Sequence, residues 1–248
     1  EKNFRDNWGK IWNLERGKKY LTKKRQDMEI TIQQIRENPE IRTYIERADI
    51  SLKEMGYTEH SFQHVTIVAK VAGDMLRDLG YDDHVVELAR IAGWMHDIGN
   101  VINRVNHAQS SAIMAFRILD NMGMPAEDVA VVIAAIGNHD ESTAWPVSAV
   151  SAALIIADKT DVRRSRVRNR NNMENFDIHD RVNYAVLNND KVLDTKEKTF
   201  TQHIKIDTEI ANIIDYFEIY MNRMILVRRA AEFLGLRFKL RVNGSKMC

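Results

Sequence analysis

Ionisable side chains stand at the ends of several apolar stretches in this 248-residue sequence. In IAGWMHDIGN, residues 91–100, His96 and Asp97 directly follow a run of apolar residues. VAVVIAAIGNHD leads in the same way to His139, and VSAVSAALIIAD leads to Asp158. A lone buried carboxylate is costly unless a cation or hydrogen-bond donors compensate it. The repeated pattern therefore predicts that these polar groups meet inside an apolar surrounding.

Six side chains share this placement where an apolar run meets a loop: His64, His96, Asp97, His107, His139 and Asp158. Any one of the histidines alone would more often be a core or capping residue than a ligand, so the weight lies in the set. Imidazole nitrogen and carboxylate oxygen suit Zn, Fe, Mn or similar divalent ions. Several helices that each deliver one such donor are what a metal centre inside a helical bundle needs.

Composition narrows the class of protein. The one cysteine, Cys248, excludes an internal disulfide framework and a thiolate metal site. A net charge of +1 argues against a general nucleic-acid coat, although basic clusters at residues 16–25 and 163–170 could bind anions locally. No run approaches the roughly 18 consecutive apolar residues of a membrane span, and no stretch reads as a signal peptide. We therefore expect no membrane association and a cytoplasmic location.

Helices must position the six donors. Apolar residues recur at helical spacing through the first two thirds of the chain, where only three prolines interrupt them. We expect helices over about residues 24–37, 40–56, 60–79, 82–98, 107–122, 126–138 and 147–162. The first 25 residues mix aromatic and basic side chains, which fits either a partner or nucleic-acid surface or an amphipathic segment packed on the core.

The last third has a different pattern. RVNYAVLNN, KTFTQHIKID and LRFKLRVNG alternate polar and β-forming residues, which predicts strands, and an amphipathic helix over about 208–235 precedes the last of them. The predicted fold class is therefore mainly α, a helical bundle with a small C-terminal α+β appendage in the order strand, strand, helix, strand. We expect an N-terminal helical extension at 1–58, a metal-binding helical domain at 59–170, and the appendage packed on it at 171–248.

The order His, His-Asp, His, His, Asp, with HDIG intact, resembles the HD-domain metal-dependent phosphohydrolase superfamily over about residues 60–162. The HD region is similar to those of ribonuclease Y and HD-GYP proteins, and the resemblance implies an HD-domain helical bundle. It makes His64, His96, Asp97 and Asp158 the core metal ligands, with Asp97 as the bridge between two metals.

The same resemblance makes His107 and His139 the residues that complete the second metal site. It implies two divalent transition metals, Fe, Mn, Zn or similar, with His96 and Asp97 at the centre of catalysis. HD-GYP proteins carry a Glu four residues before the first His, where this chain has His60. If residues 60–64 are helical, both imidazoles lie on one face, so His60 is a further candidate ligand.

Two departures limit the resemblance. HD-GYP proteins and ribonuclease Y usually read HDIGK, whereas this chain has Asn100 at the position of the lysine, and the GYP signature is absent. Hydrolysis of cyclic di-GMP is therefore not supported.

The resemblance implies hydrolysis of a nucleotide-like phosphomonoester or phosphodiester by a hydroxide that bridges two metals about 4 Å apart. Cations near the ligands are candidates for phosphate binding: Arg104, Lys159, Arg163, Arg164 and Arg166. On one helix, Lys159, Arg163 and Arg166 would share a face with the exit of Asp158. The alternative for these arginines is a solvated helix end paired with acids.

Expected partners are a phosphorylated small molecule or nucleotide, with RNA as a further candidate. The appendage could either pair its edge with a second copy of the chain, which would make a homodimer, or cover the site. Two other functions compete with hydrolysis. One is a di-iron oxygenase, because some HD-domain members with a similar six-ligand pattern oxidise organic substrates. The other is a non-catalytic nucleotide- or RNA-binding module in which the metal is structural.

Overall fold

The computed structural model describes residues 30–168 and 173–248. Of the two units into which the chain divides, residues 1–30 and 31–248, the second holds every element discussed below. The aromatic and basic segment at the N-terminus lies outside the described residues, as does the start of the helix predicted at 24–37.

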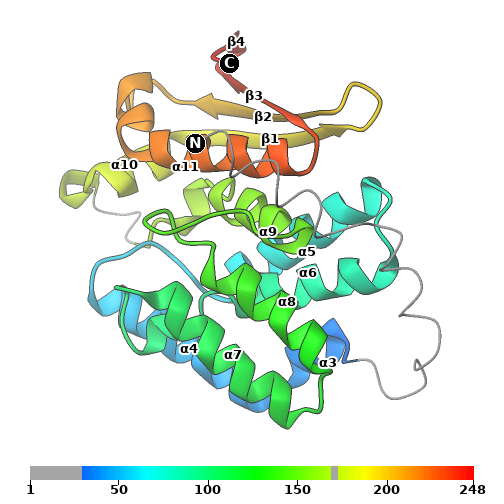
Figure 1. The fold of residues 1–248 in the computed structure, drawn as a ribbon. Coiled ribbons are helices and arrows are strands. Elements are labelled where there is room, and N and C mark those ends of the chain that lie inside the picture. The colour runs from blue at the N-terminus through cyan, green and yellow to red at the C-terminus, as the bar shows by residue number, and fades with distance from the viewer. Residues whose placement is uncertain (1–29, 169–172) are drawn as a thin grey trace. The chain divides into compact units, whose positions relative to one another are not determined.

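Helices form the first part of the described chain (Figure 1). They are α3 (Ile32–Glu37), α4 (Pro39–Glu54), α5 (Phe62–Asp78), α6 (Asp83–Met95), the 3-10 helix η1 (Ile98–Val101), α7 (His107–Asn121), α8 (Ala126–Gly137) and α9 (Ala149–Lys159). Polar side chains begin several of them: Ser61 caps α5, Asp82 caps α6 and Ser148 caps α9. The prediction of a mainly α fold is confirmed.

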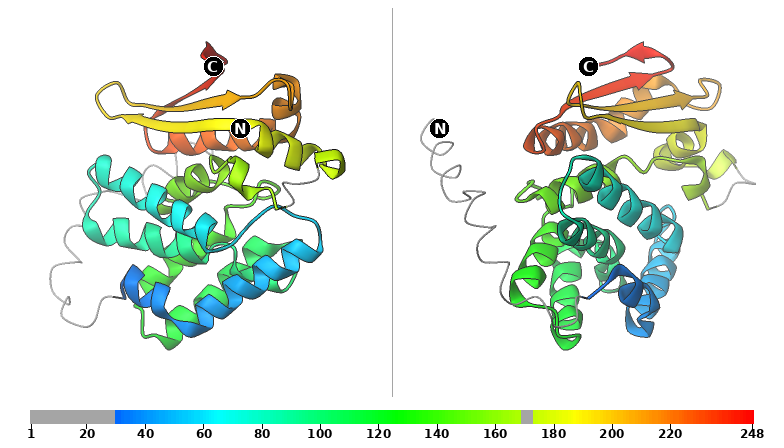
Figure 2. Two further views of the ribbon diagram at one scale, coloured as in Figure 1. Left: turned by 180° about the vertical axis from the view of Figure 1, so that it is seen from behind. Right: turned by 90° about the vertical axis from the view of Figure 1, so that its right-hand side faces the viewer.

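Helix α9 is the centre of the described structure. It packs against α5, α6 and α8 on one side and against α11 (Ile213–Phe233) on the other. Residues 150–157 are buried all round, as their run of apolar residues, interrupted only by Ser151, indicates. In Figures 1 and 2, α9 lies between the helices below and the sheet-bearing part above.

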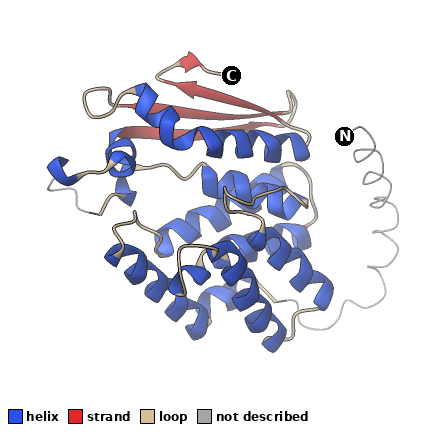
Figure 3. Cartoon of the chain, turned by 60° about the vertical axis from the view of Figure 1, so that its left-hand side comes forward, coloured by secondary structure: helices blue, strands red, loops and turns tan. Residues whose placement is uncertain are grey.

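The C-terminal part is a four-stranded sheet in the order β1 (Val186–Asp194), β2 (Thr199–Ile206), β3 (Arg237–Val242) and β4 (Ser245–Lys246). Strands β1 and β2 are antiparallel, and β2 and β3 are parallel because α11 connects them as a crossover. Figure 3 shows α11 along one face of the sheet. The register pairs Phe200 with Phe238, and both rings are buried. The predicted order strand, strand, helix, strand is confirmed by β1, β2, α11 and β3, and the two-residue strand β4 follows them.

The first predicted strand begins later than expected. Residues 178–185 form a helix, α10 (Ile178–Ala185), and only residues 186–194 form β1. Asp177 begins α10, since its side chain accepts a hydrogen bond from the backbone N–H of Asp180. Val182, Asn183 and Ala185 are buried on the inner face of this helix. Over so short a stretch, periodicity does not distinguish a helix from a strand.

Helix α9 ends at Lys159, and the chain does not continue as a helix through residue 162. It turns at Thr160 and forms the short 3-10 helices η2 (Arg164–Arg166) and η3 (Met173–Asn175). Within the described ranges, no helix is both long and apolar enough to cross a membrane.

Candidate metal centre

The structure brings all six predicted donors together at the ends of five helices. His64 lies in the first turn of α5, His96 and Asp97 follow α6, and His107 begins α7. His139 follows α8, and Asp158 lies at the end of α9. Five of the six are buried, and only 12% of the Asp158 side chain is exposed.

Four of these residues form a first cluster. Nε2 of His64 lies 3.2 Å from Nε2 of His96 and 3.4 Å from Oδ1 of Asp158. Oδ2 of Asp97 lies 3.3 Å from Nε2 of His96 and 3.6 Å from Nε2 of His64. The ligand atoms of His64, His96 and Asp158 all lie within 4.8 Å of one another, which is close enough to hold one divalent ion.

A second cluster uses the other oxygen of Asp97. Nε2 of His107 and Nε2 of His139 lie 3.2 Å apart, and they are 3.5 Å and 3.8 Å from Oδ1 of Asp97. Oδ1 of Asp140 lies 3.9 Å from Nε2 of His107. The carboxylate of Asp97 thus stands between two groups of imidazoles, one on each oxygen.

Each of the four imidazoles is held through its other ring nitrogen. Nδ1 of His96 lies 2.9 Å from the carbonyl of Gly93, Nδ1 of His107 lies 3.0 Å from that of Arg104, and Nδ1 of His139 lies 2.6 Å from that of Ile136. A carbonyl oxygen only accepts, so Nδ1 carries a hydrogen, and Nε2 offers its lone pair whenever the ring is neutral. The rings therefore present Nε2 toward Asp97, as metal ligands require.

His64 is held by a carboxylate that sequence reasoning missed. Its Nδ1 donates to Oδ2 of Asp161 at 2.7 Å. Asp161 is itself buried and is bound by Nε of Arg163 at 3.1 Å, while Nη2 of Arg163 bonds Glu59 at 2.6 Å. The only signal in the sequence was a second Asp three residues after Asp158, which looks like an ordinary loop residue.

The HDIGN segment is fitted closely against the start of α7. Gly99 donates its N–H to the hydroxyl of Ser111 at 2.8 Å. A Cβ at residue 99 would collide with the backbone of His107 and Ser111, so only glycine allows this approach. Gly99 thereby brings His107 next to Asp97.

Burial and charge set the ionisation of the donors. Burial disfavours the imidazolium and lowers the pKa of His107 to about 4. Burial by itself would raise the pKa of Asp97, but the charge of His96 and hydrogen bonds outweigh it and hold that pKa well below its ordinary value. Burial also opposes ionisation of Asp158, and the Lys159 ammonium overcomes it in the same way. Ionised carboxylates and a neutral imidazole are the forms that bind metal.

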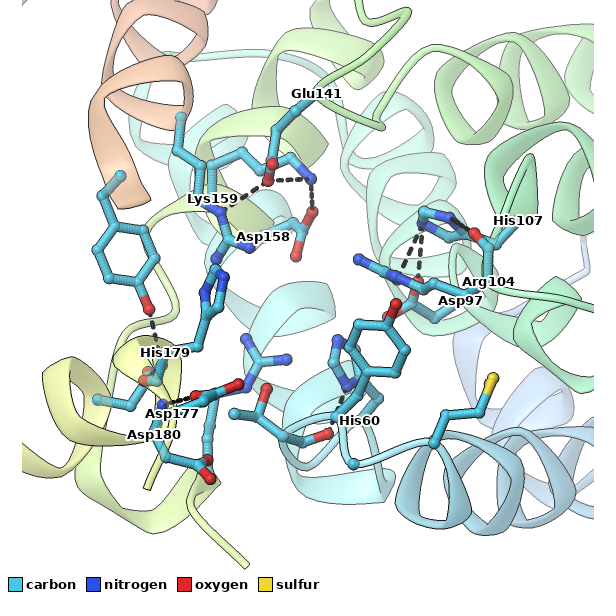
Figure 4. A pocket seen from close by; sticks show the side chains of 18 of the residues that line it. His60, Asp97, Arg104, His107, Glu141, Asp158, Lys159, Asp177, His179 and Asp180 are labelled. Atoms are coloured by element: carbon cyan, nitrogen blue, oxygen red, sulfur yellow. Dashed lines mark hydrogen bonds and ion pairs between the residues drawn. The ribbon is translucent and has the colours of Figure 1, made fainter. Parts of the chain in front are cut away.

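The donors open into a pocket of about 460 Å³ (Figure 4). The pocket lies between the candidate metal ligands on one side and residues of α10 and α11 on the other, and Figure 4 shows His107 and Arg104 opposite His179 and Asp180. The charged and polar residues that line it include Asp97, Arg104, His107, His139, Glu141, Asp158, Lys159, Arg166, Asp177, His179, Asp180, Asn183, Tyr220 and Arg223.

The predicted phosphate-binding cations divide into two groups. Arg104, Lys159 and Arg166 line the pocket, whereas Arg163 and Arg164 are not among its lining residues. Nε of Arg164 donates instead to the carbonyl of Tyr184. The helical face expected to join Lys159, Arg163 and Arg166 does not form, because α9 ends at Lys159 and residue 163 is extended.

His60 also lines the pocket, although it lies outside a helix. The hydroxyl of Ser61 accepts from the backbone N–H of Gln63, so α5 begins after His60. Nδ1 of His60 lies 2.8 Å from the carbonyl of Thr58, and its ring packs edge-on against that of His64 with centroids 5.5 Å apart. Burial and the positive charge of Arg166 lower the pKa of His60 well below its ordinary value.

Residues of α10 and α11 were not among the predicted site residues. Oε1 of Glu141 lies 2.7 Å from Nε of Arg223 and 3.3 Å from Nζ of Lys159. Lys159 in turn lies 2.7 Å from Oδ2 of Asp158. A chain of alternating charges therefore joins α11 to the first cluster.

Comparison with known proteins decides the family. Residues 61–218, more than half of the chain, match the HD domain family. The chain belongs to the HD domain family. The range that matches the HD domain contains all six candidate metal ligands and extends into α11. An uncharacterized protein of Methanocaldococcus jannaschii is 25% identical over 205 residues, which cover 73% of this chain and 76% of that protein.

Proposed function

We propose that this HD domain protein is a metal-dependent phosphohydrolase that cleaves a nucleotide-like phosphomonoester or phosphodiester. HD domains bind divalent metals, and they are usually metal-dependent phosphohydrolases. The observation that carries the proposal is the position of Asp97, whose Oδ2 faces His64 and His96 while Oδ1 faces His107 and His139. This sharing supports two ions, Fe, Mn, Zn or similar, with Asp97 as the bridge.

Two ions bound there would acidify a water molecule and polarise the phosphoryl oxygens. The chain's own residues would bind and orient the ester. Arg104, Lys159 and Arg166 line the pocket and offer positive charge to the phosphate oxygens. In the hydrolysis the water oxygen bonds to phosphorus, the P–O bond to the alcohol breaks, and the alcohol leaves with a proton.

The dimensions of the pocket bear on the substrate. A volume of about 460 Å³ lies within the range of roughly 300–1,000 Å³ that is usual for small-molecule sites. Residues of α10 and α11 line one side of it. Both observations support a phosphorylated small molecule or a single nucleotide over an internal stretch of RNA.

The test is phosphate release from a panel of nucleotides, sugar phosphates and simple esters by protein that was stripped of metal and reloaded with Mn²⁺, Fe²⁺ or Zn²⁺. Asp97→Asn should lower turnover on the order of a thousandfold while the fold is retained. The matched control is Asp74→Asn, because Asp74 is partly exposed on α5, where it pairs with Lys70 and Arg77. Its activity should equal that of the unaltered protein.

Other outcomes would contradict hydrolysis and identify the competing function. Failure of the fully loaded protein to cleave any ester would count against the proposal. A mixed-valent iron spin signal with oxygen consumption would favour the di-iron oxygenase. Tight, salt-sensitive binding of nucleotide or RNA without turnover would favour the non-catalytic module.

A further inference from the structure

Asn100 is fully buried beside the shared carboxylate. Its Nδ2 donates to Oδ1 of Asp97 at 2.9 Å and to the carbonyl of Asp97 at 3.0 Å. Both of those atoms only accept hydrogen bonds, so the amide nitrogen must face Asp97 and the amide oxygen must face away. Oδ1 of Asn100 accepts from Nη1 of Arg104 at 3.3 Å.

Arg104 is held in place on three sides. Besides the bond to Asn100, its guanidinium lies 5.6 Å from the centre of the Tyr57 ring, and Nη1 lies 3.4 Å from Nε2 of His107. A guanidinium stays protonated at every accessible pH. A fixed positive charge therefore lies against the nitrogen that His107 presents to the second cluster.

The two clusters differ in charge. The first contains two carboxylates, those of Asp97 and Asp158, whereas the second shares only Oδ1 of Asp97 and has Asp140 at its margin. Lys159, the cation beside the first cluster, is already shared between Asp158 and Glu141. The contacts of Arg104 within the described residues are neutral groups, so its charge is not offset in the same way.

We propose that Arg104, positioned by Asn100, makes the His107–His139 cluster the weaker of two metal positions, and that a phosphate group strengthens this position by pairing with the guanidinium. The inference rests on the proposed function in taking Asp97 to serve two ions. Like charges close together repel, and a phosphate between them would be attracted to both. Because coupling is reciprocal, an ion at the second cluster should also strengthen phosphate binding.

Metal counting tests the proposal without turnover. The metal-free full chain is titrated with Mn²⁺, free Mn²⁺ is read from its spin-resonance signal, and the titration is repeated with inorganic phosphate against a protein-free control. We expect two classes of Mn²⁺ site whose affinities differ by at least about tenfold, and phosphate should reduce this difference in affinity. In Arg104→Met the weaker site should bind Mn²⁺ about tenfold more tightly, and phosphate should change its affinity less.

Arg117→Met is the matched control, because it removes the same charge from α7, the helix that begins three residues after Arg104. Arg117 is exposed and pairs with Glu40, and it does not line the pocket. It should retain both classes and the phosphate response of the unaltered protein.

Two equal classes in the unaltered protein without phosphate, or an unchanged second class in Arg104→Met, would overturn the proposal. A protein that binds one ion in every variant would overturn it too. If the ions load as expected but no ester is cleaved, the hydrolase proposal fails and the unequal metal positions stand. If esters are cleaved but the two metal classes are equal, the hydrolase proposal stands and the unequal metal positions fail.

Discussion

Hydrogen bonds from Nδ1 fix the orientation of the imidazoles in the site. Three of the four bind backbone carbonyls through Nδ1, and those acceptors cannot be removed by changing a side chain. His64 is the exception, because its acceptor is the carboxylate of Asp161. A carboxylate behind a ligating imidazole fixes its tautomer and raises its basicity. A substitution of Asp161 therefore tests the hydrogen bond that holds the His64 ring without changing the ring itself.

Replacing Asp161 by Asn should weaken metal binding at the first cluster by about tenfold to a hundredfold. The amide oxygen can still accept from His64, but the negative charge that increases the basicity of the ring is lost. Affinity is measured by competition with a chromophoric chelator. Asp128→Asn is the control, because Asp128 binds His84 at 2.7 Å in a His–Asp pair that does not line the pocket. Equal affinities in Asp161→Asn and the unaltered protein would contradict the role.

At the scale of elements, periodicity predicted the helices that carry the donors. It failed where distant contacts decide the local structure. The basic run after Asp158 reads as a continuing helix, yet the chain turns there, and Asp161 bonds His64 and Arg163 bonds Glu59 across about a hundred residues of sequence. No local pattern reports such a contact. The sequence therefore predicted six residues that the structure brings together, but not the contact of Asp161 with His64.

The tie between Glu59 and Arg163 joins the loop before α5 to the segment after α9. Burial opposes ionisation of Glu59, but the Ser61 hydrogen bond and the charge of Arg163 outweigh it and lower the pKa of Glu59 below 4.5. Because the pKa of Glu59 is lower in the folded state, its ionisation stabilises the fold at pH values above the pKa of the unfolded state. That stabilisation is lost as pH falls through the folded value.

Glu59→Gln should therefore lower the free energy of unfolding by about 1–2 kcal/mol at pH 7. The difference between the two proteins should shrink as pH falls below about 4.5, because the glutamate then becomes neutral too. Denaturant unfolding at a series of pH values measures it. A difference that is absent at pH 7, or that grows toward acid, would show that the pair does not act through charge.

At the scale of the whole described structure, the pocket belongs to both parts of the chain. The helices that carry the candidate ligands provide one wall, and α10 and α11 provide the other through Asn183, Tyr220 and Arg223. The sequence predicted the C-terminal helix as a packing element, because its apolar stripe is its strongest signal. Its polar contacts with the site could not be predicted, since Arg223 meets Glu141 across a sequence separation that periodicity does not report.

If α11 serves the substrate rather than the metals, Arg223→Met should raise KM about tenfold on an ester that the protein cleaves and leave metal content unchanged. Arg223 lies 4.8 Å from the Tyr220 ring and 2.7 Å from Glu141, so its loss leaves Lys159 as the sole cation beside Glu141 among the described residues. Glu141 should then attract the Lys159 ammonium more strongly, which leaves less of its charge to bind the phosphate. KM and bound metal are measured together.

Arg229→Met is the control on the same helix. Arg229 lies over the exposed ring of Trp145, 5.6 Å from its centre, and does not line the pocket. Its KM should match that of the unaltered protein. Loss of metal from Arg223→Met would mean that the charge chain through Glu141 and Lys159 supports Asp158 as a ligand. An unchanged KM with full metal content would mean that α11 closes the pocket without contacting the substrate through Arg223.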